Sequence, residues 1–192
     1  MTQTSKTALV VVDVQPTFME GGGLPVPDGE AVVEVINRLM SRFDYVITTQ
    51  DWHIDPGEHI SNKPNFVDKW PAHGLANTPE AEVHPDLHRA FINFYVKKGQ
   101  YGAAYSGFQG EIEDGRTLQE LLWELGVERV FVCGLATDYC IKETALDAKR
   151  FGFSTTVLLA ATRGVSDQST EDAIRQMDQA GIELDRTSWN GF

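Results

Sequence analysis

The sequence has few of the features that would place it in a membrane or outside the cell. No apolar run approaches the roughly 20 residues that span a bilayer. The segment before the first apolar run, residues 1–6, is short and mostly polar, and it lacks the apolar stretch of a signal peptide. We therefore expect a cytoplasmic protein with no membrane partner. Only two cysteines are present, Cys133 and Cys140. In a cytosolic chain such a pair is more often one buried and one functional thiol than a disulfide.

Positive charge is also scarce. Lys and Arg number 16 against 28 Asp and Glu, which leaves a formal charge of -12 at pH 7. A surface of this sign repels phosphate backbones and anionic lipids, so we expect no nucleic-acid partner. The net charge leaves the substrate open, because the local potential of a site can oppose it.

Internal repeats, low-complexity tracts and linkers are absent as well. The 192 residues are 42% hydrophobic and 23% charged, an ordinary balance for a folded chain. This length suits one domain with a full core. We therefore expect a single domain over residues 1–192.

What the sequence does contain is an alternation of short β-rich runs and amphipathic stretches. The run Thr7–Asp13 is apolar up to its final carboxylate, as in a strand buried on both faces. The pattern predicts strands at 7–13, 45–50, 92–97, 129–133, 154–160 and 182–184, and helices at 30–43, 117–125, 137–151 and 169–180. The expected fold is α/β, with three α/β/α layers around a central, mostly parallel, Rossmann-like sheet of about six strands.

One long segment breaks this alternation. Residues 51–89 show little periodicity, and loops of that length inside a compact domain are usually functional. In open parallel sheets the site lies beyond the carboxyl ends of the strands. Asp13, Asp51, Lys98 and the segment Gly134–Cys140 each follow a predicted strand. We therefore expect one crevice to collect them.

Cys140 is the candidate nucleophile. It follows a predicted strand and begins a predicted helix, with Thr137 as the expected N-cap. There the helix dipole and free N–H groups favour a thiolate, and the same N–H groups can stabilise an oxyanion. The alternative is a buried apolar side chain, the commoner fate of a free cysteine. The neighbouring strand ends at Asp13 and Lys98 favour the nucleophile, whereas Cys133, inside a strand, is interpreted as the buried thiol.

A thiol phosphatase also places a cysteine between a strand and a helix. It needs a phosphate-binding arginine in a loop after that cysteine, and residues 141–146 contain none. The predicted helix also begins before Cys140, which leaves no phosphate cradle. The sequence therefore disfavours this alternative.

Asp13 and Lys98 are the candidate base and its partner. Asp13 ends an apolar strand, where a carboxylate is costly unless it is paired or hydrogen-bonded. Lys98 can hold Asp13 ionised while Asp13 takes the thiol proton. The alternative is an ion pair that only closes the edge of the sheet. Alternation along the strand points Lys97 to the opposite side from Lys98.

Asp51, His53, His59 and His73 are the candidate metal ligands. Asp51 and His53 stand at alternate positions, so an extended chain turns both toward one point. A carboxylate with imidazoles and an open position suits one divalent ion: zinc, iron or manganese. The alternative is that His59 and His73 are loop side chains bonded to backbone groups. We assign that role to His84 and His88, in a segment expected to be helical.

Five segments together resemble one known family, the nicotinamidases and pyrazinamidases among the isochorismatase-like hydrolases. In chain order they read VVVDVQPTFMEGGGLPV, TTQDWHIDPGEHI, WPAHG, KKGQYGAAYSGFQG and CGLATDYCIKETALDA. The resemblance extends from about Ala8 to Val165. Tyr139 and Lys97 lie beside the matched positions.

The resemblance implies a role for each matched residue. Asp13, Lys98 and Cys140 match the catalytic triad, and Asp51, His53 and His73 match the metal ligands, with His59 a ligand in some relatives. The amides of Ala136 and Cys140 match the oxyanion hole, and the Leu135–Ala136 bond matches one that is typically cis. The expected substrate-binding residues are Phe18, Trp70, Leu135 and Tyr105.

The resemblance also implies a reaction. It is the metal-dependent hydrolysis of nicotinamide, and of pyrazinamide, to the acid and ammonia through a cysteine thioester, as in NAD salvage. NAD itself is not expected as a cofactor, because no G-x-G-x-x-G follows the first strand. The alternatives are an amidase for another small amide, a vinyl-ether hydrolase of the isochorismatase type, and a non-catalytic binding module. Relatives range from monomers to larger assemblies, so a homo-oligomer stays open.

Overall fold

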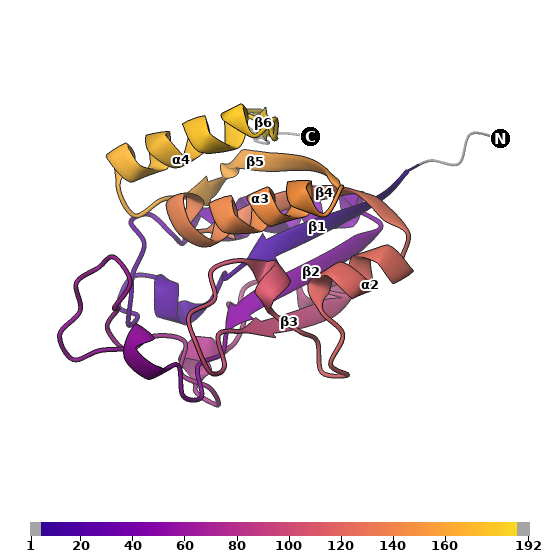
Figure 1. Cartoon of the computed structure of the whole chain (residues 1–192). Helices are drawn as coiled ribbons and strands as arrows, with labels where there is room; N and C mark the ends of the chain where they lie inside the picture. The colour runs from indigo at the N-terminus through magenta and orange to yellow at the C-terminus, as the bar shows by residue number, and fades with distance from the viewer. Residues whose placement is uncertain (1–4, 188–192) are drawn as a thin grey trace.

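Six parallel strands form the centre of the computed structural model, which describes residues 5–187. The strands are β1 (Lys6–Val12), β2 (Tyr45–Asp51), β3 (Phe94–Lys98), β4 (Val127–Leu135), β5 (Ser154–Arg163) and β6 (Glu183–Asp185). Their order in the sheet is β3-β2-β1-β4-β5-β6, and every neighbouring pair is parallel. The predicted central parallel sheet is therefore confirmed (Figure 1).

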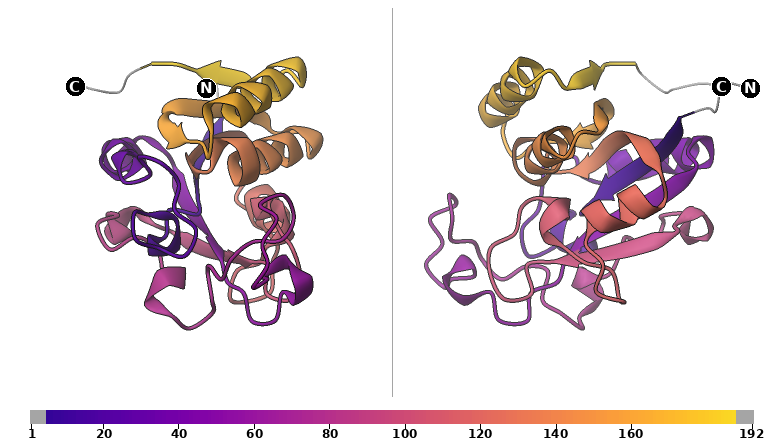
Figure 2. Two further views of the ribbon diagram at one scale, coloured as in Figure 1. Left: turned by 90° about the vertical axis from the view of Figure 1, so that its left-hand side faces the viewer. Right: turned by 45° about the vertical axis from the view of Figure 1, so that its right-hand side comes forward.

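Helices cover both faces of this sheet. They are α1 (Ala31–Leu39), α2 (Leu118–Glu124), α3 (Lys142–Arg150) and α4 (Asp167–Gln179). The apolar stripe of α1 packs on the face that carries Leu9 and Val11, whereas the other three helices contribute to the core on the face of Val10 and Val12. The left view of Figure 2 shows α1 on one side of the sheet and α2–α4 on the other. This confirms the three-layer prediction.

The order of the strands places the site. The chain builds outward from β1 to β3, then crosses back to lay β4 on the other side of β1. At such a reversal the loops beyond the carboxyl ends diverge and leave a crevice. Val12 pairs with Gly134 and Asp51 with Lys98 in the sheet register, so the ends of four strands lie at one edge.

The irregular segment between β2 and β3 covers this edge. It contains only short 3-10 turns, at Gly57–His59, Pro79–Ala81 and Arg89–Phe91. The predicted helical character around His84 and His88 was wrong, because both residues lie outside any α-helix. Figure 1 and the right view of Figure 2 show this segment in purple and magenta, beyond the arrowheads of β1 and β2.

The connection after β4 also differs from the prediction. Residues Thr137–Ile141 form a π-helical turn, called here the nucleophile turn, and α3 begins only at Lys142. Thr137 is not an N-cap, because Ala136 occupies that position and the Thr137 hydroxyl donates to Thr162 Oγ1 at 2.9 Å. Lys98, expected just past a strand, is the last residue of β3.

No helix among residues 5–187 combines the length and the apolar character needed to cross a membrane.

Gly134 lies where β1 and β4 approach each other closely at the site, so its replacement tests whether this close approach stabilises the fold. Its φ is +112°, and a Cβ there would lie 2.1 Å from the Val12 carbonyl oxygen. We expect Gly134→Ala to lower the free energy of unfolding by about 2–5 kcal/mol, from backbone strain and collision together. Thermal and urea unfolding measure this loss.

Gly152 provides the matched control, because its φ is +91° and a Cβ added there would meet no atom within 4 Å. Gly152→Ala should cost only about 1–2 kcal/mol, the backbone part alone. Equal losses for the two variants would show that the close approach of β1 and β4 contributes nothing.

Candidate active site

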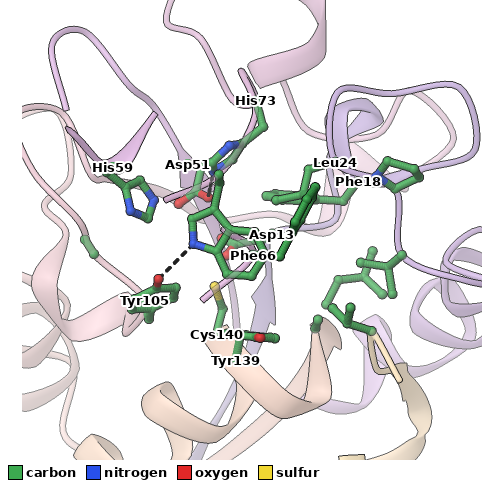
Figure 3. A pocket seen from close by; sticks show the side chains of 17 residues that line it. Asp13, Phe18, Leu24, Asp51, His59, Phe66, His73, Tyr105, Tyr139 and Cys140 are labelled. Atoms are coloured by element: carbon green, nitrogen blue, oxygen red, sulfur yellow. Dashed lines mark hydrogen bonds and ion pairs between the residues drawn. The ribbon is translucent and has the colours of Figure 1, made fainter. Parts of the chain in front are cut away.

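A pocket of about 340 Å³ lies at the carboxyl ends of β1 and β4. Asp13, Asp51, His59, His73 and Cys140 supply its polar groups, and its remaining lining is mainly apolar and aromatic. Figure 3 shows the Cys140 sulfur pointing from the nucleophile turn toward Asp13, with Asp51, His59 and His73 across the pocket. A crevice therefore lies where it was expected, lined by Asp13, Asp51 and residues of the segment 135–140, whereas Lys98 is fully buried and is not among the residues that line it.

Cys140 is buried in the nucleophile turn, and its Sγ accepts a hydrogen bond from Lys98 Nζ at 3.6 Å. Burial raises the pKa of this thiol well above its ordinary value, although the Lys98 charge opposes the shift and Asp13 adds to it. The helix start was expected to favour a thiolate, but desolvation of the buried sulfur acts in the opposite direction and is the largest influence on its pKa. A thiol with a raised pKa needs a base to become a nucleophile.

Asp13 is suited to be that base. Its Oδ1 accepts a hydrogen bond from Thr49 Oγ1 at 2.7 Å, and its Oδ2 is buried with no directed hydrogen bond, 2.9 Å from Lys98 Nζ. Burial raises the pKa of Asp13, with Lys98 opposing the shift. An oxygen with free acceptor capacity and a raised pKa can take a proton from a neighbouring thiol.

Lys98 contacts more groups than the sequence indicated. Its fully buried Nζ pairs with Asp13 and with Asp51 Oδ1, and donates to the Ala104 carbonyl at 3.0 Å. Burial alone would lower its pKa, but the two carboxylates raise the pKa well above the ordinary range. Lys97, by contrast, points away and lies 3.5 Å over the Trp52 ring, as alternation predicted.

Asp51 connects this triad to the histidines. Burial alone would raise the pKa of Asp51, but Lys98 and then the neighbouring histidines hold it well below its usual value. Its Oδ1 pairs with Lys98, while its Oδ2 lies 3.7 Å from His53 Nε2 and 3.6 Å from His73 Nε2. The sequence predicted Asp51 only as a metal ligand and missed its contact with Lys98.

The histidine geometry fits a divalent cation. His53 Nδ1 lies 2.7 Å from the Gly99 carbonyl and His73 Nδ1 lies 2.8 Å from the Pro71 carbonyl. A carbonyl only accepts, so each Nδ1 carries a proton, and Nε2 is the nitrogen of each ring that can offer a lone pair to a metal. These two Nε2 atoms face each other at 3.2 Å beside the Asp51 carboxylate. Converging lone pairs are favourable around a cation, and the carbonyl partners are those expected behind metal-binding histidines.

His59 joins the same cluster. One ligand atom from each of His53, His59 and His73 can be chosen so that all lie within 4.8 Å of one another. Burial, followed by the other two histidines, lowers the pKa of His59 to about 4, so its ring is neutral at pH 7. Its buried Nδ1 has no hydrogen-bond partner. The chain thus offers one carboxylate and three imidazoles to a divalent metal.

The predicted substrate-binding residues Phe18, Trp70, Tyr105 and Leu135 all line the pocket. Trp70 Nε1 donates to Tyr105 Oη at 2.9 Å, which fixes both rings (Figure 3). Ala136 also lines the pocket, and the Leu135–Ala136 peptide bond is cis, as the resemblance implied.

Sequence reasoning missed three residues around the site. Phe66 and Tyr139 line the pocket and pack edge-on against Trp70, at ring-centroid distances of 6.3 and 5.2 Å. Gln15 is fully buried, and its amide both donates to the Asp51 carbonyl and accepts from the Asp51 N–H. For Gln15, its position two residues after Asp13 was the one signal in the sequence that could have indicated a place in the site. The aromatic contacts arise from chain segments that no local pattern connects.

The raised pKa of Cys140 can be tested by alkylation. In chelated protein, the rate with iodoacetamide should rise with pH through a midpoint above 9.0, the ordinary thiol value. Asp13→Asn should move this midpoint down, because it removes a negative charge beside the sulfur. Mass spectrometry of the labelled peptides follows each cysteine, and Cys140→Ala gives the background from Cys133. A midpoint at or below 9.0, or one that Asp13→Asn leaves unchanged, would contradict the assignment.

Known proteins share this fold and match the chain over nearly its whole length. Residues 7–188 match the Isochorismatase domain family. A nicotinamidase/pyrazinamidase of Mycobacterium tuberculosis is 43% identical over 180 residues, which cover 92% of this chain and 97% of that protein. A solved Acinetobacter baumanii nicotinamidase/pyrazinamidase superposes with a TM-score of 0.86 at 36% identity, covering 95% of this chain and 97% of that one.

A further solved relative contains a metal. The pyrazinamidase of Pyrococcus horikoshii in complex with zinc is 36% identical, with a TM-score of 0.81, and the match covers 95% of this chain and 99% of that one. These identities extend over nearly the whole of both chains, and the solved relatives share the overall fold of this chain. The chain belongs to the isochorismatase domain family, and these relatives are nicotinamidases and pyrazinamidases.

Proposed function

We propose that this protein hydrolyses nicotinamide to nicotinate and ammonia. One observation carries the proposal: two sets of reactive side chains line the same aromatic pocket, namely Asp13 with Cys140, and Asp51 with His59 and His73. The buried Lys98 pairs with the carboxylate of each set. A flat ring with a ligating nitrogen and a carboxamide matches these two sets of groups. The nicotinamidases among the relatives support the same substrate.

We assign the divalent metal to Asp51, His53, His73 and His59. When bound, it supplies a Lewis-acid position for the ring nitrogen of the substrate. The zinc in the Pyrococcus relative supports zinc, and the same donors suit iron or manganese. Phe18, Trp70 and Tyr105 would then hold the ring between their side chains.

The reaction begins with the thiol of Cys140. Asp13 Oδ2 takes the Sγ proton, and the thiolate attacks the carboxamide carbon, so that an S–C bond forms as the C=O π electrons move to oxygen. The backbone N–H groups of Ala136 and Cys140 stabilise this oxyanion. Lys98 keeps its charge throughout and limits the cost of the developing negative charge.

Collapse of this intermediate breaks the C–N bond. Asp13 returns its proton to the leaving nitrogen, which departs as ammonia and leaves a thioester on Cys140. Asp13 then deprotonates a water molecule, which attacks the thioester carbon. As the S–C bond breaks, Asp13 returns this proton to the Cys140 sulfur, and the product acid releases its own carboxyl proton to solvent and leaves as nicotinate. The proton balance closes over one turnover, because Asp13 accepts and returns a proton in each half.

The wider proposal follows from the same pocket. Pyrazinamide carries the same carboxamide on a ring with a second nitrogen, and we include it as a substrate that feeds the same steps. We assign residues 1–192 to one domain and the reaction to NAD salvage. Another small amide is the alternative substrate. The cytoplasmic location, the lack of nucleic-acid partners and any homo-oligomer stay predictions from the sequence.

Replacement of the nucleophile tests the covalent route. Cys140→Ala should lower kcat for ammonia release from nicotinamide by about 10⁴-fold or more, because no other thiol lines the pocket. Coupled ammonia assays measure the rate, and circular dichroism confirms the fold. The matched control is Cys133→Ala, a fully buried thiol within β4, which should keep its kcat while losing some stability. Substantial turnover by Cys140→Ala would refute the thioester.

Replacement of a histidine tests the metal site. His73→Ala should lose most of its bound metal in elemental analysis and raise KM for nicotinamide by about tenfold or more, equivalent to at least 1.4 kcal/mol. His59→Ala decides whether His59 is a ligand by the same two readouts. The control is His84→Ala, a buried histidine paired with Glu30 at 3.2 Å outside the cluster. Full metal content in His73→Ala would remove this residue from the ligand set.

A further inference from the structure

Asp138 is a buried carboxylate in the nucleophile turn, two residues before Cys140, and it does not belong to the triad. Its Oδ1 accepts from the Val165 N–H at 3.0 Å, and its Oδ2 accepts from the Ser169 hydroxyl at 2.5 Å. The residue is only 4% exposed. The carboxylate therefore joins the nucleophile turn to a segment more than 25 residues later in the chain.

An irregularity in the pairing of β4 with β5 brings the segment that contains Val165 and Ser169 to the site. Val132 of β4 pairs with Val157, but Gly134, two residues on, pairs with Thr162. Residues 158–161 therefore have no partner in the ladder with β4, and β5 continues to Arg163 beside the end of β4. The sequence predicted that this strand ends at Ala160 and assigned no role to the residues between it and the last helix. The irregularity places Thr162, Val165 and Ser169 around the nucleophile turn.

Hydroxyl groups extend the network to the first turn of α4. Ser166 is the N-cap of this helix, and its Oγ accepts from the Ser169 N–H at 3.2 Å. The Ser166 and Ser169 hydroxyls lie 2.6 Å apart. Ser169 has one hydroxyl proton, and Asp138 can only accept it, so Ser166 must donate to Ser169. The carboxylate is thus held by directed bonds at the amino-terminal end of a 13-residue helix, where negative charge is favourable.

Gly164 packs so closely beside Asp138 and Thr170 that a side chain added there would have to displace Thr170. A Cβ at Gly164 would meet Thr170 Oγ1 at 1.8 Å and Asp138 Oδ1 at 3.3 Å. On the other side of the turn, the Thr137 hydroxyl bonds to Thr162. The nucleophile turn is therefore fixed on both sides of Asp138 by the end of β5 and the start of α4.

The turn itself transmits this constraint to the reacting groups. The Ala136 carbonyl accepts from the N–H groups of both Tyr139 and Ile141, each at 3.1 Å, so Ala136 and Cys140 belong to one hydrogen-bonded unit. A shift of Asp138 would rotate the two amides assigned to the oxyanion. Such donors act through their alignment with the charge that develops in the transition state.

We propose that Asp138 is a positioning residue that aligns the Ala136 and Cys140 amides with the oxyanion, and that Ser169 and the Val165 N–H hold it in place. The proposal rests on the proposed amide hydrolysis. Asp138 itself is not among the residues that line the pocket. Asp138 therefore acts on stabilisation of the transition state. Binding of the substrate ring depends on Phe18, Trp70 and Tyr105 and on the histidine cluster.

The test compares Asp138→Asn with wild type in the metal-loaded protein. The neutral amide presents only one acceptor oxygen to two donors, so the turn loses part of its support. We expect kcat for nicotinamide to fall about 10- to 100-fold, with KM within about threefold. Ser169→Ala should give a smaller fall in kcat, and the double variant should lose less than the product of the two single losses, because both act on one contact.

A second readout separates alignment from general damage. Pyridine-3-carbaldehyde adds the Cys140 thiol across its C=O bond, so that the S–C bond forms and the carbonyl oxygen enters the oxyanion position, where it is held as the oxyanion or protonated by the thiol proton. Nicotinate has no such step. Asp138→Asn should weaken inhibition by the aldehyde about tenfold or more, and leave inhibition by nicotinate within about twofold. Metal content should stay at the wild-type level.

Asp44→Asn is the matched control. The Asp44 carboxylate also accepts from a backbone N–H and a hydroxyl, both of Thr7, at 2.8 and 2.9 Å, but at the opposite end of the sheet. This variant should lose stability and keep kcat and the aldehyde affinity. Asp138→Asn with kcat within twofold of wild type, or with equal loss of aldehyde and nicotinate binding, would overturn the proposal. If the wild-type protein did not hydrolyse nicotinamide, the proposed function itself would be refuted, and this result would not depend on any variant.

Discussion

The Lys98 ammonium group is fully buried between the carboxylates of Asp13 and Asp51 and donates to the Cys140 sulfur. Each of these groups would be costly to bury alone, and the loss of one partner from a buried ion pair typically costs about 3–5 kcal/mol. The arrangement is stable only as a set. Because Asp51 also faces His53 and His73, the charge of Lys98 fixes the histidine cluster relative to the nucleophile.

This charge distribution also decides where the protons lie. Lys98 stays charged and Asp51 stays ionised, whereas burial raises the pKa values of both Asp13 and Cys140. Asp13, the candidate base, is therefore a stronger base than a free aspartate. It can accept the proton and return it, which suits a cycle in which Asp13 does so twice.

The groups around the sulfur are held by segments that are remote in sequence. The irregular chain between β2 and β3 brings the histidines and Trp70 over the sheet, and the bulged end of β5 with α4 fixes the turn that carries Cys140. The parallel sheet explains why this works. Its strands end together at the reversal point, so each loop needs only to fold back over a common edge.

The sequence alone determined the layers and the succession of strands and helices, and it predicted the main candidate reacting groups. Asp13, Asp51 and Lys98 could be found because a charged residue at the end of a buried strand is conspicuous, and Cys140 because it follows such a strand. The sequence could not determine how Lys98 divides between two carboxylates, the protonated state of Cys140, or the roles of Gln15, Tyr139 and Asp138. Those depend on distances of a few ångströms between segments far apart in the chain, and on desolvation, which exists only once the core has closed around them.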